Sequence, residues 1–336
     1  MGARVEGNTR MKLLIITQVV DTEDPILGFF VRWIEEFAKH NERIEVICLK
    51  EGAHALPGNV RVHSLGKERG TARRIVYARR FLSLVWRLRG DYDAVFVHMN
   101  PEYVVLGGLF WRLRDKRTAL WYTHKSVDTK LRVATFLSSI VFTASKESFR
   151  LPSKKVRVMG HGIDTNFFSL EPAMTRTTAV LSAGRLSPTK RHDLVIRAAE
   201  HFPNEVWIVG EGPEKLNLEQ LAESLSLTGR VRFLGPQTQE GLREKYRAAG
   251  VFVHASETGS LDKVVLEALA CGLPVITTSV ALTGLPVTTV PAASGAIARE
   301  VMATRPADTR SLAAFVREYH SLQRLIPAIM DVMQTA

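Results

Sequence analysis

The stretch VFVHASETGSLDKVVLEALACGLPVITT, residues 251–278, decides the fold of this chain. It starts with an apolar run, Val251 to Val253, and continues through a turn-rich loop into a short predicted helix over residues 262–270. The sequence Cys271-Gly272-Leu273-Pro274 would stop that helix, and a second apolar run follows. A strand, a loop, a helix and a strand in so short a segment predict one unit of a parallel α/β sheet.

A single carboxylate, Glu267, lies inside this otherwise apolar helix. Burying a carboxylate is costly unless other groups hydrogen-bond to it, so we favour a functional position over a solvated one. A helix N-terminus that points out of a strand end is also a natural site for phosphate. The segment therefore suggests a nucleotide-sugar site, with phosphate near the helix start and ribose hydroxyls on Glu267.

Composition sets the limits for the rest of the chain. Its 336 residues suggest two domains, and a hydrophobic fraction of 46% is ordinary for a globular protein. Cys48 and Cys271 lie in apolar surroundings, which predicts two reduced, buried thiols in a cytosolic protein. No apolar run reaches the length of a membrane span. Residues 1–10 are polar, and we expect a disordered leader there.

Strand-like and helix-like segments alternate along both halves of the sequence. In the first half we expect strands over 12–17, 44–49, 60–64, 94–98, 118–123 and 139–144, and helices over 29–39, 69–89, 103–114 and 131–137. In the second half we expect strands over 179–183, 205–209 and 231–234, and helices over 192–201, 216–225 and 239–248. The alternation predicts parallel sheets with helices on both faces. The tail over 311–333 is predicted to be helical, with a break at Pro327.

The net charge of +11 is confined to the first half of the chain. Residues 1–168 hold 28 basic and 17 acidic side chains, whereas the remaining 17 basic and 17 acidic side chains cancel. Much of the excess lies in residues 69–89, RGTARRIVYARRFLSLVWRLR, a predicted basic amphipathic helix. Such helices bind anionic membranes, and the alternative is an ordinary exterior helix of the sheet. A nucleic-acid partner is disfavoured, because the basic residues lack aromatic stacking platforms in a recognisable module.

A second motif reads Ser182-Ala183-Gly184-Arg185-Leu186 and is followed by Lys190. A predicted strand ends at Gly184, and open α/β sheets bind ligands at the carboxyl ends of their strands. Arginine and lysine suit phosphate oxygens, although two surface cations in a polar loop are the alternative interpretation. In Val209-Gly210-Glu211-Gly212-Pro213, a Gly-x-Gly turn follows another strand, and we expect Gly210 and Gly212 to shape the pocket.

Residues 251–278 resemble the donor-binding signature of the retaining glycosyltransferases of family four. That signature contains two glutamates separated by seven residues and ends in a Leu-Glu-Ala run before Ala-Cys-Gly. Glu267 matches the second glutamate, but Gly259 stands at the position of the first. Ser260-Leu261-Asp262-Lys263 replaces the usual Gly-rich turn. The ribose end of the family pattern is thus present, and the sugar end departs from it.

The resemblance implies the GT-B fold, an α/β architecture of two Rossmann-like domains whose parallel sheets face an interdomain cleft. It implies an acceptor-side domain over 11–160 and a nucleotide-sugar-binding domain over 161–310, with the boundary near Gly160 to Ser169. It also implies that residues 311–336 form a helix that crosses back to the first domain.

The resemblance assigns roles to residues that match the family positions. Arg185 and Lys190 would neutralise the donor diphosphate, and His124, after the strand ending at Thr123, would lie near the sugar hydroxyls. Gly28 would let the backbone approach the donor phosphates. The other donor-binding positions it implies are Gly184, Gly210, Gly212, Gly259, Ser260, Leu261, Asp262, Lys263 and Glu267. No metal is expected, since Asp91-Tyr92-Asp93 is interpreted as a turn before a strand.

These expectations combine into a retaining, metal-independent glycosyltransferase that requires no cofactor besides its nucleotide-diphospho-sugar donor. The acceptor would be a glycan or a lipid-linked sugar in cell-envelope glycan biosynthesis. The protein would be cytoplasmic and peripheral on the inner face of the membrane. Two alternatives share the fold and remain open, a nucleotide-sugar epimerase and a non-catalytic nucleotide-sugar-binding protein.

Overall fold

The computed structural model describes residues 10–70, 72–171, 173, 175–257, 259, 261–304 and 308–335. The chain divides into two compact units, one of Met1–Met159 with Leu325–Ala336 and one of Gly160–Arg324. Most of the expected leader, residues 1–9, lies outside the described part of the chain.

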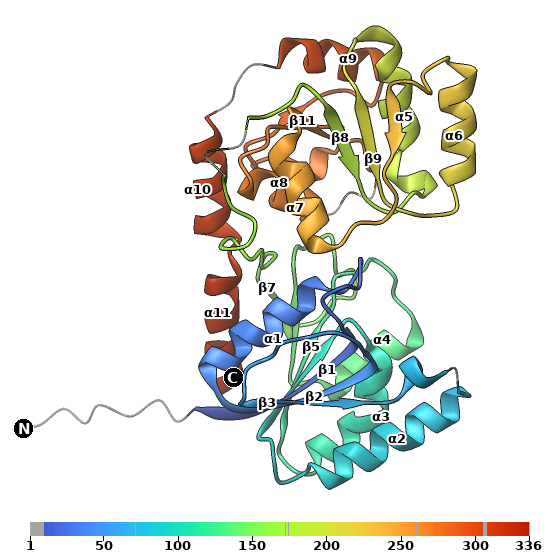
Figure 1. The fold of residues 1–336 in the computed structure, drawn as a ribbon. Helices are drawn as coiled ribbons and strands as arrows, with labels where there is room; N and C mark the ends of the chain where they lie inside the picture. The colour runs from blue at the N-terminus through green and yellow to red at the C-terminus, as the bar shows by residue number, and fades with distance from the viewer. Residues whose placement is uncertain are drawn as a thin grey trace, which may run out of the picture. The chain divides into compact units, whose positions relative to one another are not determined.

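The first unit is built on a seven-stranded sheet in the order β3-β2-β1-β4-β5-β6-β7, with all neighbours parallel (Figure 1). Its strands are β1 (Met11–Val20), β2 (Asn41–Glu51), β3 (Val60–Ser64), β4 (Ala94–His98), β5 (Arg117–Trp121), β6 (Ile140–Thr143) and β7 (Val156–Val158). In the register, Ile15 of β1 lies between Val46 of β2 and Phe96 of β4. The central strands are mostly buried and largely apolar, as expected for a parallel sheet covered on both faces.

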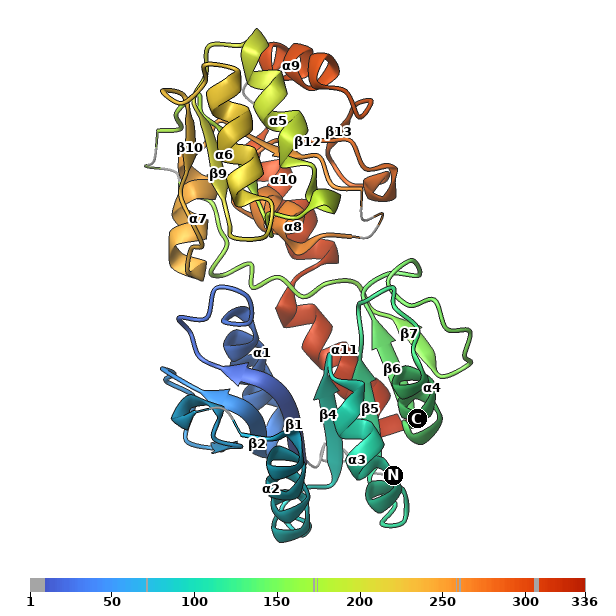
Figure 2. The same ribbon diagram turned by 90° about the vertical axis from the view of Figure 1, so that its right-hand side faces the viewer.

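Helices cover both faces of this first sheet. The helices are α1 (Phe29–His40), α2 (Arg74–Arg87), α3 (Pro101–Arg112) and α4 (Thr129–Leu137), and α11 (Leu322–Thr335) contributes its later turns. Helices α2, α3 and α4 are labelled in Figure 2. They bury Phe81, Trp111 and Leu131 in one core with Val95 and Val97 of β4. Because side chains alternate along a strand, Phe96 faces the other way, and it packs against Phe37 of α1.

The second unit repeats the architecture with a six-stranded parallel sheet in the order β10-β9-β8-β11-β12-β13. Its strands are β8 (Val180–Ala183), β9 (Val206–Val209), β10 (Val231–Phe233), β11 (Val251–His254), β12 (Val275–Thr277) and β13 (Thr288–Thr289). Its α-helices are α5 (His192–Ala198), α6 (Lys215–Ser224), α7 (Gln239–Ala248), α8 (Lys263–Ala270), α9 (Ser294–Ala303) and α10 (Thr309–Tyr319). Helices α5, α6 and α9 pack on one face and α7, α8 and α10 on the other.

Both sheets reverse their strand order at one place. In the first sheet this switch lies between β1 and β4, and in the second it lies between β8 and β11. Connections from the two neighbouring strands leave toward opposite faces there, so the loops after them diverge and leave room for a ligand. In the second unit, the strand order therefore favours a ligand site at the loops that follow β8 and β11.

The expected strands and helices are confirmed, with two corrections. The predicted 69–89 helix is shorter, because residues 67–69 form a separate 3-10 turn and α2 begins at Arg74. The predicted break at Pro327 is wrong, because Pro327 lies inside α11. The interruption instead lies at His320 and Ser321, where the His320 carbonyl and the Leu322 amide pair with the backbone of Ile163. Helix α9 and the short strands β7 and β13 were not expected.

The two cysteines are free and buried, as the composition predicted. Burial raises the pKa of each thiol to about 12, so both stay protonated at neutral pH. Among the described residues, no helix combines the length and apolarity needed to cross a bilayer.

Candidate functional site

An ion pair marks the switch point of the second sheet. Lys190 follows β8, and its ammonium nitrogen lies 2.6 Å from Oδ2 of Asp262, which follows β11. Both side chains are largely buried, with 19% and 16% of their surface exposed. A buried ion pair is costly to build and is weak evidence for stability, so its presence at a ligand-binding edge favours a functional role.

A chain of hydrogen bonds holds Asp262 from the other side. His254, the last residue of β11, donates from Nε2 to Asp262 Oδ2 at 2.7 Å, and its Nδ1 lies 3.1 Å from the Thr277 hydroxyl. The Thr277 hydroxyl oxygen also accepts the Ser279 amide at 3.1 Å. Burial alone would raise the pKa of Asp262, but the His254 hydrogen bond and the Lys190 charge outweigh it and hold the pKa well below its usual range. Asp262 is therefore a fixed carboxylate.

Two more contacts join the loops after β8 and β11. The Glu257 amide donates to the Thr189 carbonyl at 2.9 Å, and the Glu257 carboxylate pairs with Arg191. Arg191 is in the left-handed region at φ 51° and also binds Asp193 at 3.0 Å. The loop that carries Lys190 is thus attached to the loop that carries Asp262 by backbone and side-chain contacts.

Close packing of backbone requires glycine at both ends of the Gly210-Glu211-Gly212 turn. A Cβ on Gly210 would lie 1.9 Å from the Gly184 carbonyl oxygen, and one on Gly212 would lie 2.2 Å from that of Leu186. Gly184 and Gly210 have φ angles of 150° and 140°, which disfavour other residues. The Gly184 amide donates to the Val209 carbonyl at 3.0 Å. These glycines shape the loops after β8 and β9.

Glu267 is buried in the middle of α8, with 4% of its surface exposed. Tyr246 of α7 donates its hydroxyl to Glu267 Oε2 at 3.2 Å. Burial and the adjacent Glu267 charge raise the pKa of Tyr246 well above its usual value, so the phenol remains a donor. A buried carboxylate one turn from the start of α8 is the arrangement that the sequence analysis expected.

Gly259, Leu261 and Lys263, which belong to the part that departs from the family signature, lie just before or at the start of α8. Gly259 has φ 57°, a conformation that a glutamate adopts only with strain. The Leu261 carbonyl accepts a hydrogen bond from His161 at 2.7 Å. Lys263 is the first residue of α8, and burial lowers its pKa to about 8 despite the opposing charges of Glu267 and Asp262. Ser260 lies outside the described residues.

The structure brings Lys190, Asp262 and Lys263 to one end of the second sheet and leaves Arg185 in a different setting. Arg185 follows Gly184 at the same edge, but its side chain is exposed to solvent. Leu186, next in the chain, is buried and anchors this loop to the core. Arg185 is therefore available to an anion from outside, whereas Lys190 is held by Asp262.

Gly28 and His124 lie in the first unit. Gly28 precedes α1, and a Cβ there would lie 2.6 Å from the Asp24 carbonyl oxygen, so the turn itself requires glycine. His124 follows β5 on an exposed loop, where its Nδ1 accepts the Ser126 amide at 3.1 Å. At the switch point of the first sheet stands a different histidine, His98, which is buried and stacked on Phe30 at 3.9 Å between ring centroids.

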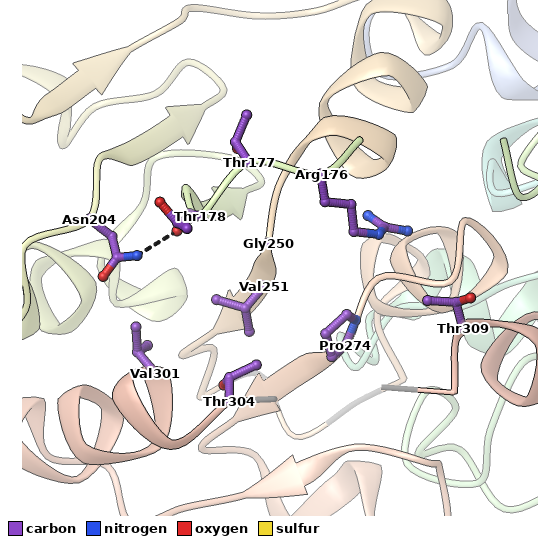
Figure 3. Close-up of a pocket in the computed structure, with 10 residues that line it drawn as sticks. All are labelled: Arg176, Thr177, Thr178, Asn204, Gly250, Val251, Pro274, Val301, Thr304 and Thr309. Atoms are coloured by element: carbon purple, nitrogen blue, oxygen red, sulfur yellow. Dashed lines mark hydrogen bonds between the residues drawn. The ribbon is translucent and has the colours of Figure 1, made fainter. Parts of the chain in front are cut away.

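A cavity of about 320 Å³ in the second unit lies at the amino ends of the strands, opposite the end that carries the candidate site. Figure 3 shows Thr177, Thr178, Gly250, Val251 and Pro274 around it, all at the amino ends of strands. Arg176 extends beside it and donates to the carbonyls of Tyr246, Arg247, Ala249 and Cys271, at the ends of α7 and α8. This cavity is not the candidate site. Within the described ranges, no three His, Cys, Asp or Glu side chains gather as metal ligands.

The family model of the glycosyl transferases group 1 matches residues 164–305, which include every second-unit residue of the candidate site. The second unit is therefore similar to this family over residues 164–305, a little under half of the chain.

One curated relative is similar to part of the chain, and two solved structures are similar to nearly all of it. D-inositol 3-phosphate glycosyltransferase of Mycobacteroides abscessus is 44% identical over 115 residues, or 32% of this chain and 25% of the relative. The chain therefore spans about a quarter of the length of this curated relative. Anabaena HepE in complex with UDP-glucose is similar with a TM-score of 0.74 and 20% identity, over 97% of this chain and 100% of HepE. Sucrose-phosphate synthase from Thermosynechococcus elongatus gives 0.71 and 18%, over 96% and 98%.

These likenesses confirm the predicted GT-B fold, with its two parallel α/β sheets. The sequence did not point to His254, Thr277 and Tyr246, which complete the hydrogen bonds around Asp262 and Glu267. The signal for His254 was present: a polar residue ends an otherwise apolar strand within the signature segment. Tyr246 carried no comparable signal, because an aromatic residue in an amphipathic helix is ordinarily a core residue.

Proposed function

We propose that this chain is a retaining glycosyltransferase that moves a sugar from a nucleotide-diphospho-sugar to a glycan or lipid-linked acceptor. The observation that carries the proposal is the Lys190–Asp262 ion pair at the switch point of the second sheet, next to the start of α8. Arg185 and Lys190 would bind the diphosphate, and Glu267 would accept hydrogen bonds from the ribose hydroxyls. UDP-glucose is the first donor to test, since HepE was solved with it.

The positive charges of Lys190 and Arg185 suit cleavage of the bond between the sugar and the diphosphate. As the bond from the sugar C1 to the diphosphate oxygen breaks, negative charge grows on the phosphate, and Lys190 and Arg185 stabilise it more in the transition state than in the ground state. The acceptor oxygen bonds to C1 on the same face, and its proton passes to the departing phosphate oxygen. Configuration is retained, and the route requires no metal ion.

We assign to Asp262 part of the role of the missing glutamate at position 259. The carboxylate is fixed by His254 and Lys190, so it can accept hydrogen bonds from sugar hydroxyls without reorienting. When the diphosphate takes Lys190 as its partner, Asp262 keeps the bond from His254. The left-handed backbone of Gly259 supports this assignment, because a glutamate at that position would be strained.

Two assays test the function together. Thermal shifts with UDP-, GDP-, ADP- and dTDP-sugars identify the donor base, and release or transfer of labelled sugar reports the reaction. We expect stabilisation by one nucleotide class and transfer to an added acceptor. A thermal shift without sugar release would instead indicate a binding protein, and conversion of the sugar without an acceptor would indicate an epimerase.

Asp262→Asn tests the assignment of the carboxylate, with Asp193→Asn as the matched control. Asp193 pairs with Arg191 in the neighbouring loop. We expect Asp262→Asn to lower transfer about 100-fold while leaving the affinity for the bare nucleotide diphosphate within about threefold. Equal transfer by the two variants would show that Asp262 does not contact the sugar.

The setting of the reaction is the second part of the proposal. We infer that the protein is cytoplasmic, takes part in cell-envelope glycan biosynthesis and works at an anionic membrane surface. The support is the charge of residues 69–89, whose arginines lie on and around α2 in the first unit.

A further inference from the structure

Helices α2, α3 and α4 present an apolar outer surface in addition to the one they bury. Helix α3 packs beside both α2 and α4 on the same face of the first sheet (Figures 1 and 2). The exposed apolar side chains are Ile75, Leu82 and Trp86 of α2, Val105, Leu106 and Leu109 of α3, Leu113 after α3, and Val133 and Phe136 of α4. We call this set the outer apolar face. Single exposed apolar residues are ordinary, but a set that spans three adjacent helices marks an interaction surface.

The spacing on α3 produces a continuous stripe. Val105, Leu109 and Leu113 follow one another at intervals of four residues, so they lie on one side of the helix. Leu109 and Leu113 are 60% and 76% exposed, and Phe136 of α4 is 66% exposed. Exposing three large apolar side chains to water costs free energy, and a partner that covered them would recover it.

Arginines surround these side chains. Residues 72–90 contain six arginines and no acidic residue: Arg73, Arg74, Arg79, Arg80, Arg87 and Arg89. The guanidinium carbons of Arg89 and Arg114 lie 4.7 Å and 5.5 Å from the ring centroid of Trp86. Arg114 also lies 5.0 Å from the Phe110 ring, and the two rings are 5.8 Å apart. Exposed aromatic rings with cations beside them suit the interface between lipid headgroups and acyl chains.

A basic pocket lies where α3 and α4 end. It has a volume of about 380 Å³ and is lined by Arg112, Lys116, Arg117 and Lys155, with one carboxylate, Asp115, and the ring of Phe136. The Lys155 ammonium donates to the carbonyls of Phe136 and Ser138 at 2.7 Å each, and Arg117 donates to the Met333 carbonyl at 2.8 Å. Carbonyls fix these cations without cancelling their charge.

Phe136 joins the pocket to the outer apolar face. Arg112 and Lys155 lie 5.4 Å and 5.9 Å from the Phe136 ring centroid, and the ring itself is exposed. Burial and the neighbouring charge of Arg112 lower the pKa of Lys155, in keeping with a positive potential in the pocket. An anion held here would lie directly beside apolar side chains.

We propose that the outer apolar face docks on a bilayer containing anionic phospholipids and that the basic pocket holds one lipid phosphate. A nucleic acid has no partner for Leu109, Leu113 and Phe136, and a second copy would oppose two arginine-rich faces. A lipid surface supplies acyl chains for the apolar side chains and phosphates for the cations. The proposal deepens the membrane part of the proposed function, but it does not require that sugar transfer occur.

Sedimentation with vesicles tests the docking. We expect binding to vesicles of phosphatidylcholine and phosphatidylglycerol, and at least tenfold weaker binding to phosphatidylcholine alone. Raising the salt concentration weakens the charge contribution and leaves the apolar one. Equal binding to both vesicles, or binding to neither, would overturn the proposal.

Two double variants separate the apolar and charge contributions. Leu109→Ser/Leu113→Ser and Arg74→Glu/Arg79→Glu should each lower binding to the anionic vesicles about tenfold or more. Leu216→Ser/Met302→Ser, exposed positions of the second unit, and Arg299→Glu/Arg310→Glu are the matched controls and should bind like the parent. Loss only in the charge variant would indicate simple adsorption and would contradict docking through the apolar face.

Arg112→Gln tests the pocket, with Arg157→Gln as its control outside it. We expect about fivefold weaker binding for Arg112→Gln alone. Inorganic phosphate at constant ionic strength should not displace the parent from vesicles; displacement would show a site for a soluble anion. Each variant is also tested for its thermal shift with nucleotide. An unchanged shift shows that the second unit is intact, so a failure of docking is distinguishable from a failure of the proposed function.

Discussion

Lys190 in the second unit and the arginines of α2 in the first unit handle positive charge in opposite ways. Lys190 is largely buried, and its partner Asp262 is held in turn by His254. Arg74 and Arg79 are exposed on a helix whose surroundings, residues 72–90, contain no carboxylate in sequence. A buried cation with one fixed partner suits exchange with one ligand, whereas many exposed cations produce a diffuse field that attracts any anionic surface.

The comparison predicts that single changes matter at the first kind of site and not at the second. Desolvated charges interact strongly because water does not screen them, so removing one partner leaves the other uncompensated. Exposed charges are screened and individually contribute little. The four predictions below compare the two regions, in order of decreasing effect.

The largest effect is expected for Lys190→Ala. Loss of a cation that stabilises charge on the departing phosphate should lower the turnover number by a factor of about 100 to 1,000. Labelled-sugar transfer measures it, and a melting curve checks that the variant is folded. Lys215→Ala, which removes an exposed cation paired with Glu211, is the control and should retain its turnover. Parental turnover in Lys190→Ala would disprove the role of this residue.

The next effect is the pH dependence of stability that comes from His192. This buried ring lies 3.0 Å from the Ser182 hydroxyl, and burial lowers its pKa from 6.5 to about 4. The native state therefore binds fewer protons than the unfolded state between these values. The contribution is fully present above pH 6.5 and is lost as the pH falls through about 4, to an extent of about 3 kcal/mol.

Urea unfolding at pH 7 and pH 5 measures this contribution. The parent should lose more free energy of unfolding over this interval than His192→Gln does. His201→Gln, an exposed histidine of the same unit, should follow the parent. If the parent, His192→Gln and His201→Gln lose the same free energy of unfolding between pH 7 and pH 5, the native state does not hold His192 neutral.

Glu267→Gln comes third. Loss of the charged acceptor should weaken nucleotide binding about 10- to 30-fold, since a hydrogen bond to a charged group, at the lower end of its usual range, is worth about 1.5–2 kcal/mol. Titration calorimetry with the nucleotide measures it. Tyr246→Phe removes the neighbouring hydroxyl and should cost about 1 kcal/mol of stability, with nucleotide affinity nearly unchanged. A larger loss of affinity in Tyr246→Phe than in Glu267→Gln would reverse these roles.

The smallest effect is expected for the arginines of α2. Arg74→Glu/Arg79→Glu should change the free energy of unfolding by no more than about 0.5 kcal/mol, because both side chains are exposed. Nucleotide binding should also be unchanged. Urea unfolding and thermal shifts measure the two quantities, and a marked loss of either would show that the α2 surface supports the fold.

Periodicity was a good guide to the secondary structure. The ranges Val60–Ser64, Ala94–His98 and Gln239–Ala248 agree with the structure at both ends, because parallel strands and their covering helices have distinct hydrophobic periods. Helix α9 was not predicted because its first residues belong to Pro291-Ala-Ala-Ser-Gly, a composition typical of a loop. The helix break was predicted at Pro327 because proline disfavours a helix interior. The backbone pairing with Ile163 places the break at His320 instead.

The candidate site was only partly predictable. Residues inside a recognisable motif, such as Lys190 and Glu267, were found, and the structure supplied their partners. Those partners, His254 and Tyr246, are single polar groups on a buried strand and a helix, and only the packed structure shows what each faces. The left-handed backbone of Gly259 was also hidden, since sequence shows that a glutamate is missing but not the loop shape that disfavours it.

Gly210, whose absent Cβ leaves room for the Gly184 carbonyl, has a consequence for protein engineering. The loop bearing Arg185 and the loop after β9 touch backbone to backbone here, and again where Gly212 meets Leu186. A library that varies either loop, for instance to change the sugar accepted, would lose most members if position 210 were randomised. Variation is better introduced at the exposed positions around the contact, with Gly184 and Gly210 left unchanged.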